Sequence, residues 1–304
     1  MPVLLLALFA FPPMAGQFTA TKLGLTAGLT AWDVTAFRYG TASLGALVIL
    51  LCDPVRRRTM LAVPWRFAVV GLLGGALYGA IFMAATAMMP ASHSTLFAPS
   101  STITCTFLVA GIVLGVWPGA TRLLGIGIIL AGLVIFARAS GAEFDADALR
   151  GDAIFGFIGL MWGLFSVLAR KWDLDPLSCV IAMGLTGVLA LPLWLAFAPS
   201  GLGAANWPIA VGEGVFQGLV LMFGGFLAYM TLVQRLGPQS AALGVATVPP
   251  LGVAIASLVL GEQTHPGQWV GAAIVVCGLA LASGVNLGWI RRAIAGRTVL
   301  HKAR

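Results

Sequence analysis

The chain has 304 residues, of which 60% are hydrophobic and only 9% are charged, and its formal net charge is +7. A soluble domain is close to a quarter charged, so this composition excludes a water-soluble globular protein and indicates a surface that faces lipid. The long apolar runs do not alternate, which favours helices over a β-barrel as the structure that pairs every backbone group in lipid.

Ten apolar segments follow one another along the chain, each close to the ~20 residues that a spanning helix needs. They are 3–22, 33–52, 67–88, 92–115, 122–139, 152–170, 177–198, 209–233, 239–260 and 267–289. The first begins "MPVLLLALFA", which lacks the basic start and the small-residue cleavage site of a signal peptide. The sequence therefore predicts an all-α integral membrane protein with ten transmembrane helices.

Basic residues are distributed unevenly between the loops. With the N-terminus inside, thirteen of them lie on the cytoplasmic side and three, Lys22, Arg138 and Arg150, on the other side. Positive charge favours the cytoplasmic side, so both termini are expected to be cytoplasmic, and 291–304 is expected to form a basic cytoplasmic tail. This topology accounts for the net charge. The sequence has no basic domain in which aromatic residues are interspersed, the pattern that would indicate a nucleic-acid partner.

The two halves of the chain resemble each other. Three glycines of the first half recur 146 residues later: Gly115, Gly125 and Gly132 match Gly261, Gly271 and Gly278. Each half holds five predicted spans, an odd number, so the second half must insert upside down. The predicted units are a first repeat, 1–140, and an inverted second repeat, 141–290. Inverted repeats recur in secondary transporters, whose substrate site lies near mid-bilayer between the halves.

Prolines interrupt three of the apolar spans. Pro12 and Pro13 lie near the middle of the first span, Pro249 and Pro250 near the middle of the ninth, and Pro99 in the outer half of the fourth. Proline in a helix interior costs ~3 kcal/mol or more. Breaks at membrane depth are tolerated where they line a cavity, so these prolines are expected to mark helix breaks and gating points. Static packing kinks are the alternative.

Two large aromatic residues lie deep in the spans. Trp162 is the one tryptophan near mid-membrane, and Tyr78 lies near the midpoint of the third span. Their N–H and O–H groups need partners, so both are expected to face the protein interior or a cavity. Phe82 and Phe165 lie about one turn further along the same helices, and aromatic core packing is the alternative for all four.

Few polar groups lie inside the spans. Glu213 and Gln217 share one face of the eighth span, and Gln17 and Ser94 lie in the outer halves of the first and fourth. Ionisable groups within a membrane are functional candidates, and Glu213 is the one carboxylate expected to be able to relay a proton.

Arg38 is expected near the outer end of the second span, where it either snorkels to the interface or pairs with Asp33. With Arg38 placed there, no cation is expected at mid-bilayer to hold a phosphate. The sequence also has no ATP-binding loop, no metal-ligand spacing and no nucleophile–base pair. The remaining aromatic, weakly polar path suits a small neutral or zwitterionic molecule. The alternative of a lipid-modifying enzyme would need a His, Asp or Cys cluster at one membrane face.

Two segments carry a family resemblance. The opening resembles that of an EamA repeat through Gly16, Phe18, Lys22 and Arg38, and "PLGVAIASLVLGEQTHPGQWVGAAIVVCGL" resembles the end of one. Nearly the whole chain is similar to the drug/metabolite transporter superfamily, and within it to bacterial aromatic amino-acid exporters. The resemblance implies ten helices in two inverted five-helix repeats and metabolite export. The first half departs from the pattern at Val116, where the repeat is expected to have Glu.

These observations predict a secondary transporter in the bacterial inner membrane that exports small neutral amino acids, aromatic ones favoured, by alternating access. It is expected to be a monomer in the lipid bilayer, without a cofactor, a metal or enzymatic activity. A facilitative uniporter, and an exporter of another small neutral metabolite, are the alternatives. The predicted substrate-binding residues are Trp162, Tyr78, Gln17, Phe18, Phe82, Phe165, Glu213, Gln217 and Ser94.

Overall fold

A computed structural model describes residues 3–89, 91–115, 117–139, 146–203, 206–236 and 247–282. Within these ranges the chain is helical and has no strand, which confirms the all-α prediction. The predicted basic tail, the end of the tenth predicted span and the start of the ninth lie outside the described residues. The elements are α1 (Val3–Thr26), α2 (Ala31–Cys52), α3 (Pro54–Ala62), α4 (Pro64–Gly74), α5 (Ala76–Ala87), α6 (Ala91–Leu114), α7 (Ala120–Ala139), α8 (Ala146–Lys171), α9 (Pro176–Phe197), α10 (Trp207–Glu213), the π-helix η1 (Gly214–Phe226), α11 (Leu227–Leu236), α13 (Val248–Leu260) and α14 (Pro266–Ala282).

Seven helical segments of the described chain are long and apolar enough to cross a membrane. They are Val3–Thr26, Ala31–Cys52, Pro64–Ala87, Phe97–Leu114, Arg150–Lys171, Pro176–Phe197 and Trp207–Tyr229. Shorter apolar helices, Ala120–Phe136, Val248–Leu260 and Pro266–Ala282, overlap the other three predicted spans. The count of ten spans and their division into two inverted repeats therefore stay predictions.

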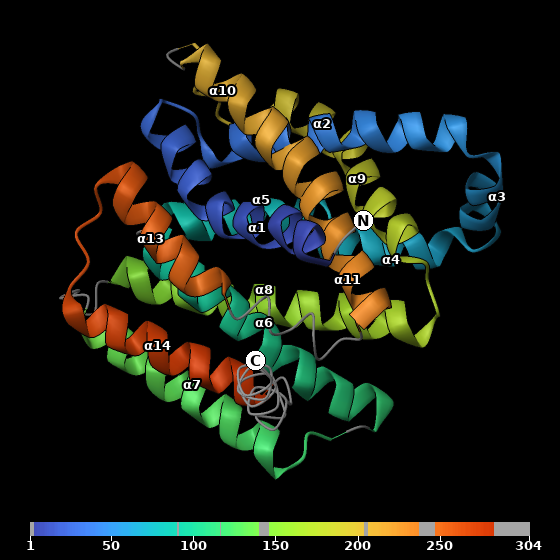
Figure 1. Cartoon of the computed structure of the whole chain (residues 1–304). Coiled ribbons are helices and arrows are strands. Elements are labelled where there is room, and N and C mark those ends of the chain that lie inside the picture. Colours follow the sequence, from blue (N-terminus) through green and yellow to red (C-terminus); the bar gives the residue numbers. More distant parts are fainter. Residues whose placement is uncertain are drawn as a thin grey trace, which may run out of the picture.

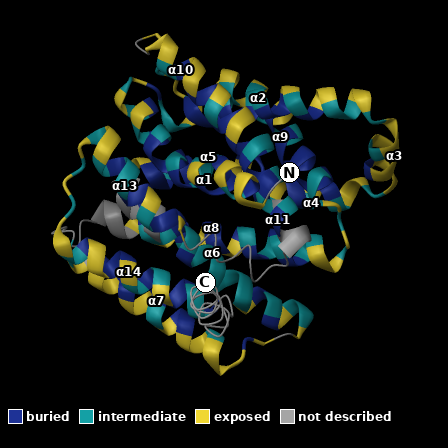
Figure 2. Cartoon of the chain, in the orientation of Figure 1, coloured by how far each residue is buried: buried dark blue, intermediate teal, exposed yellow. Residues whose placement is uncertain are grey.

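The outer surface of the helices is apolar, as expected of a protein surrounded by lipid. Leu258, Phe197 and Leu195 are 85%, 82% and 74% exposed, respectively. Figure 2 shows exposed residues along the outward faces of the helices and buried residues between the helices. An apolar surface of this extent would be unstable in water and is stable in hydrocarbon.

Helices from distant parts of the sequence lie side by side. α7 packs along α14, α6 along α8 and α2 along α9. In Figure 1, α7 and α14 form one edge of the molecule, whereas α1 and α2 lie on the opposite side of α6 and α8. The first half of the chain is thus interleaved with the second.

The contact between α7 and α14 depends on four of the repeated glycines. A Cβ on Gly132 would lie 3.0 Å from the carbonyl oxygen of Gly271, and one on Gly271 would lie 2.9 Å from that of Gly132. Gly125 and Gly278 are related in the same way, at 2.8 Å in both directions. Because the lower-numbered glycine of α7 faces the higher-numbered glycine of α14, the two helices run antiparallel. Small residues at such crossings let helix backbones approach closely in membranes.

The prolines do not all interrupt helices as the sequence predicts. α1 continues without interruption through Pro12 and Pro13, and α6 continues through Pro99. Pro249 and Pro250 fall in the first turn of α13, where a missing N–H removes no bond within the helix. In the described chain no helix break therefore occurs at Pro12, Pro13 or Pro99. A break at Pro249 and Pro250 stays a prediction, because the residues just before Thr247 lie outside the described ranges, and the gating role of all five prolines stays a prediction as well.

The break inside the third span occurs at Gly75, between α4 and α5. The Ala76 N–H donates to the Thr186 hydroxyl of α9 at 2.7 Å, and that hydroxyl donates in turn to the carbonyl oxygen of Met183 at 2.6 Å. A side chain from a neighbouring helix thus satisfies a backbone group that the break exposes, as lipid requires.

Candidate functional site

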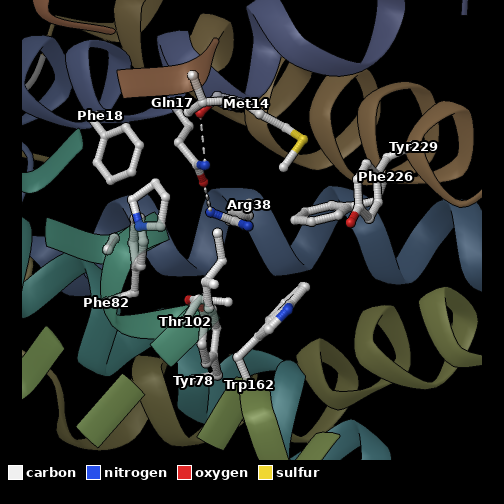
Figure 3. Close-up of a pocket in the computed structure, with 14 residues that line it drawn as sticks. Met14, Gln17, Phe18, Arg38, Tyr78, Phe82, Thr102, Trp162, Phe226 and Tyr229 are labelled. Atoms are coloured by element: carbon white, nitrogen blue, oxygen red, sulfur yellow. Dashed lines mark hydrogen bonds between the residues drawn. The ribbon is translucent and has the colours of Figure 1, made fainter. Parts of the chain in front are cut away.

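A cavity of about 150 Å³ lies where helices of the two halves of the chain meet. Figure 3 shows its lining side chains pointing toward one another from α1, α2, α5, α6, α8, η1 and α11. The lining residues are Met14, Gln17, Phe18, Arg38, Tyr78, Phe82, Ala98, Pro99, Thr102, Ile103, Trp162, Phe226, Tyr229 and Val248.

Trp162 is the centre of an aromatic wall. Its ring centroid lies 5.5 Å from that of Tyr78, 5.6 Å from that of Phe226 and 5.0 Å from that of Phe165. The ring planes are tilted by 33–46°, between the offset-stacked and edge-to-face arrangements that ring quadrupoles favour. Trp162 is half-buried and lines the cavity, whereas Phe165 is buried behind it. Phe165 therefore supports the wall rather than facing the cavity.

Phe82 extends the aromatic wall on α5. Its ring centroid lies 5.4 Å from that of Phe18 on α1 and 6.1 Å from that of Tyr78. Phe155, from α8, closes the contact from behind at 5.6 Å in an edge-to-face arrangement. The rings of α1, α5 and α8 thus form a continuous surface along one side of the cavity.

Arg38 occupies the cavity, contrary to the expectation from the sequence. It is only 2% exposed, and its Nη1 donates to Oε1 of Gln17 and to Oε1 of Gln217, each at 3.3 Å. Arg38 therefore neither snorkels to the interface nor pairs with Asp33, and the expectation that the path holds no cation is wrong. A charge within a membrane protein is costly, and it marks a functional position by default.

Asp33 has a different set of partners. Its carboxylate accepts bonds from the N–H of Thr30 at 2.8 Å, from the N–H of Gly201 at 2.8 Å and from the hydroxyl of Ser200 at 3.0 Å. It completes the capping box of α2 and fixes the chain that follows α9. Asp33 is thus a structural residue. Because its carboxylate binds these other donors, it does not act as the counter-ion of Arg38.

A hydrogen-bonded relay leads from the cavity into the protein. Nε2 of Gln217 donates to Oε2 of Glu213 at 2.6 Å and to the hydroxyl of Thr21 at 3.1 Å, while Oε1 of the same amide accepts from Arg38. Gln17 and Arg38 face the cavity, and Gln217 and Glu213 lie one layer behind them. The buried carboxylate is therefore connected to the cavity through one amide.

The structure brings five of the nine predicted binding residues to one cavity: Gln17, Phe18, Tyr78, Phe82 and Trp162. Phe165, Glu213 and Gln217 contact lining residues or their partners from behind, and Ser94 is buried in α6 away from the lining. Their part in substrate binding stays a prediction. Sequence reasoning missed Met14, Arg38, Ala98, Thr102, Ile103, Phe226, Tyr229 and Val248. For Arg38 the signal existed, since a lone cation within an apolar span is itself unusual.

A larger groove of about 1170 Å³ lies on a lateral face, between α2, α4, α5, α8 and α9. Apart from two threonines its lining is apolar, and it includes the exposed side chains of Phe157 and Phe197. The described residues of this groove offer no charged group, and the groove suits acyl chains. The central cavity, which combines a cation, an amide and aromatic rings, is the better candidate for a polar substrate. Within the described ranges, no group of three or more His, Cys, Asp or Glu could hold a metal ion.

Three curated relatives match most of the chain. An uncharacterised protein of Pseudomonas aeruginosa is 29% identical, over 94% of this chain and 96% of that protein. The uncharacterised transporter YyaM of Bacillus subtilis is 24% identical, over 82% and 83% of the two chains. A probable terminal-alkyne amino-acid exporter of Streptantibioticus cattleyicolor is 26% identical, over 92% of each chain.

The fold is also known from crystallography. One solved crystal structure aligns with a TM-score of 0.59 and 20% sequence identity, and the alignment covers 92% of this chain and 96% of that chain. The model of the EamA-like transporter family matches residues 149–284. Residues 149–284 of the chain therefore form an EamA-like transporter domain, and the helical segments that are long and apolar enough to cross a membrane suggest a multi-pass membrane protein.

Proposed function

We propose that the protein is a secondary transporter that exports small neutral amino acids, with aromatic ones favoured, by alternating access through the central cavity. The observation that carries the proposal is an aromatic-walled cavity with buried polar groups, built from helices of both halves of the chain. A similar protein is named as a probable amino-acid exporter, which supports both the substrate class and the direction of transport.

The preference for aromatic amino acids follows from the walls of the cavity. Trp162, Tyr78 and Phe82 offer rings against which an aromatic side chain can stack at an offset or edge to face. The same ring faces attract an ammonium group through the cation–π interaction. An amino acid with an aromatic side chain can use both kinds of contact at once, whereas a strongly charged side chain would lose its hydration here.

The proposed location is the bacterial inner membrane, with both termini in the cytoplasm. The excess of basic residues in the loops assigned to the cytoplasm supports this orientation. The antiparallel contact of α7 with α14, made by glycines that recur at one fixed spacing, is consistent with two inverted repeats.

The direct test is efflux of labelled phenylalanine from proteoliposomes that contain the purified protein. Efflux faster than from protein-free vesicles, competed by tryptophan and tyrosine but not by lysine or glutamate, is the expected result. Phenylalanine efflux equal to that from protein-free vesicles contradicts the proposed substrate.

Proton-coupled antiport is the form of transport that Glu213 favours, because this buried carboxylate reaches the cavity through Gln217. An imposed pH gradient should then accelerate efflux, and Glu213→Gln should remove that acceleration while leaving exchange in the absence of a gradient. Efflux that ignores the gradient in the unaltered protein identifies a facilitative uniporter instead.

A further inference from the structure

Arg38 presents a charged group to the cavity. It comes from α2, its side chain is almost fully buried, and among the described residues that line the cavity it is the one that carries a charge. Figure 3 shows its guanidinium between Gln17 on one side and Thr102 and Trp162 on the other. Arginine stays protonated in proteins and carries five N–H donors in a planar fork.

Most of these donors have weak partners or none. Nη1 reaches two amide oxygens, both at the long distance of 3.3 Å, while Nη2 reaches only the sulfur of Met222 at 3.9 Å. Nε is buried and has no hydrogen-bond partner among the residues that the structure describes. The edge of the guanidinium formed by Nε and Nη2, which binds both oxygens of a carboxylate in bidentate pairs, thus lacks an oxygen acceptor.

The charge of Arg38 is also incompletely compensated. In the described part of the chain no carboxylate lies within ion-pair distance of Arg38, and the ion pairs of Arg56 with Asp53 and Asp175 lie elsewhere. The buried Glu213 interacts with Arg38 electrostatically at longer range, and the amide of Gln217 bridges the two side chains. A buried charge without a direct counter-ion is expensive, so a group that supplies the negative charge on binding would be strongly favoured.

The surroundings restrict the anion to one kind. A single guanidinium suits a monoanion, whereas phosphate is partly a dianion near neutral pH, and its second charge would need another cation. The adjacent rings of Trp162 and Phe226 require an apolar group next to that anion. We propose that Arg38 binds the carboxylate of the substrate in a bidentate pair and so restricts the cavity to monocarboxylates with an apolar or aromatic side group. The identity of that substrate as an amino acid rests on the proposed function.

Matched pairs of an acid and its amide test this proposal on the unaltered protein. The probes are phenylalanine against phenylalaninamide, and 3-phenylpropionate against 3-phenylpropionamide, with binding measured by calorimetry in lipid nanodiscs. Each acid should bind at least about tenfold more tightly than its amide, because charge-assisted bonds are among the strongest in proteins. Amides that bind as tightly as the acids overturn the proposal, as does inorganic phosphate that binds as tightly as 3-phenylpropionate.

Variants assign the preference to Arg38. In Arg38→Gln the difference between acid and amide should disappear, and in Arg38→Lys it should survive in part, because the ammonium keeps the charge without the planar fork. Arg57→Gln, at an exposed position of α3, is the matched control and should keep the full preference. A folded Arg38→Gln protein that still prefers acids contradicts the proposal. If that variant does not fold, the comparison of each acid with its amide on the unaltered protein still tests the carboxylate site.

The outcomes separate this inference from the proposed function. If vesicles fail to transport phenylalanine while 3-phenylpropionate binds more tightly than its amide, the amino-acid function fails and the carboxylate site stands. If phenylalanine is transported while acids and amides bind alike, the function stands and the carboxylate site fails. Failure of both acids to bind overturns the site directly.

Discussion

Trp162 lines the cavity and has ring contacts to three other aromatic residues, Tyr78, Phe165 and Phe226. Replacing it by alanine removes the face against which a substrate ring would stack. We expect Trp162→Ala to lower phenylalanine efflux about tenfold, since buried aromatic anchors dominate binding energy.

The controls for this experiment come from the same chain. Trp162→Phe should retain most of the flux, because it keeps an aromatic face. Trp32→Ala should leave flux unchanged, because Trp32 is 49% exposed on α2 and does not line the cavity. Unchanged flux in a folded Trp162→Ala protein would remove this residue from the site.

Residues of this kind could be found from the sequence only in part. A tryptophan and a tyrosine at mid-span indicate an interior position because their polar atoms need partners. The position of Arg38 could not be read in the same way, because its distance from the start of α2 also fits a side chain that reaches the outer interface. Whether such a side chain turns inward depends on the acceptors that other helices supply, here Gln17 and Gln217.

At the scale of elements, the junction of α4 and α5 depends on Gly75. A Cβ there would lie 2.3 Å from the carbonyl oxygen of Gly71 and 2.3 Å from Oγ1 of Thr186. Gly75→Ala must displace backbone or break the bond to Ala76, so we expect a loss of about 1–3 kcal/mol in stability. The measurement is the thermal unfolding midpoint of the detergent-solubilised protein.

Gly127→Ala is the control for this substitution. Gly127 is exposed on α7, and a Cβ there would meet nothing within 4 Å. Its replacement should leave the midpoint unchanged or raise it slightly, because alanine favours helix by up to about 1 kcal/mol. Equal midpoints for the two variants would show that the break tolerates a side chain.

The proline pairs show the limit of reading helix breaks from sequence. Proline cannot donate a backbone bond, so two adjacent prolines in an apolar run predict an interruption. In α1 the helix nevertheless continues, whereas the third span is interrupted at a glycine that the sequence does not distinguish from many others. The difference lies in tertiary partners, since Thr186 of α9 satisfies the group freed at Gly75.

The junction between α3 and α9 should make stability depend on pH. Asp175 caps α9 through the N–H of Ser178 at 2.9 Å and pairs with Arg56. Partial burial acts to raise the pKa of Asp175, but the donors from Ser178 and the guanidinium of Arg56 outweigh it and lower that pKa below its ordinary value. A lowered pKa stabilises the folded state above the unfolded pKa of about 3.9, and the contribution is lost as pH falls further.

We therefore expect Asp175→Asn to lower the unfolding midpoint at pH 7 and to lose this effect as the pH falls below about 4. The effect should stay under about 1 kcal/mol, because the Asp175 side chain is 51% exposed. Asp173→Asn is the control, at an exposed position with a φ of 51° that asparagine tolerates. A constant difference between Asp175→Asn and the unaltered protein at every pH would contradict this assignment.

At the scale of the molecule, the proposed alternating access predicts kinetics that distinguish a carrier from a channel. A carrier that alternates between two sides returns faster when substrate is bound, so unlabelled phenylalanine inside the vesicles should accelerate entry of labelled phenylalanine several-fold. The flux should also saturate with concentration. A linear flux without acceleration by internal substrate would indicate an open pore.

The overall class could be predicted from composition alone, because a chain so poor in charge is stable only in lipid. The repeated glycines also pointed to positions that pack, and Gly125, Gly132, Gly271 and Gly278 meet between α7 and α14. The cavity itself was less accessible to sequence reasoning. Its lining comes from eight elements, and their relative rotations are set by packing between distant segments.

The unusual winding of η1 determines what one helix can contribute to the interior. Nine residues separate Gln217 from Phe226, and at about 3.6 residues per turn they would complete two and a half turns, which would direct the two side chains to opposite sides. In the wider π-helix both are buried, one bonded to Arg38 and the other packed on Trp162. Rewinding this segment to ordinary α-helical pitch would turn one of them away from the interior.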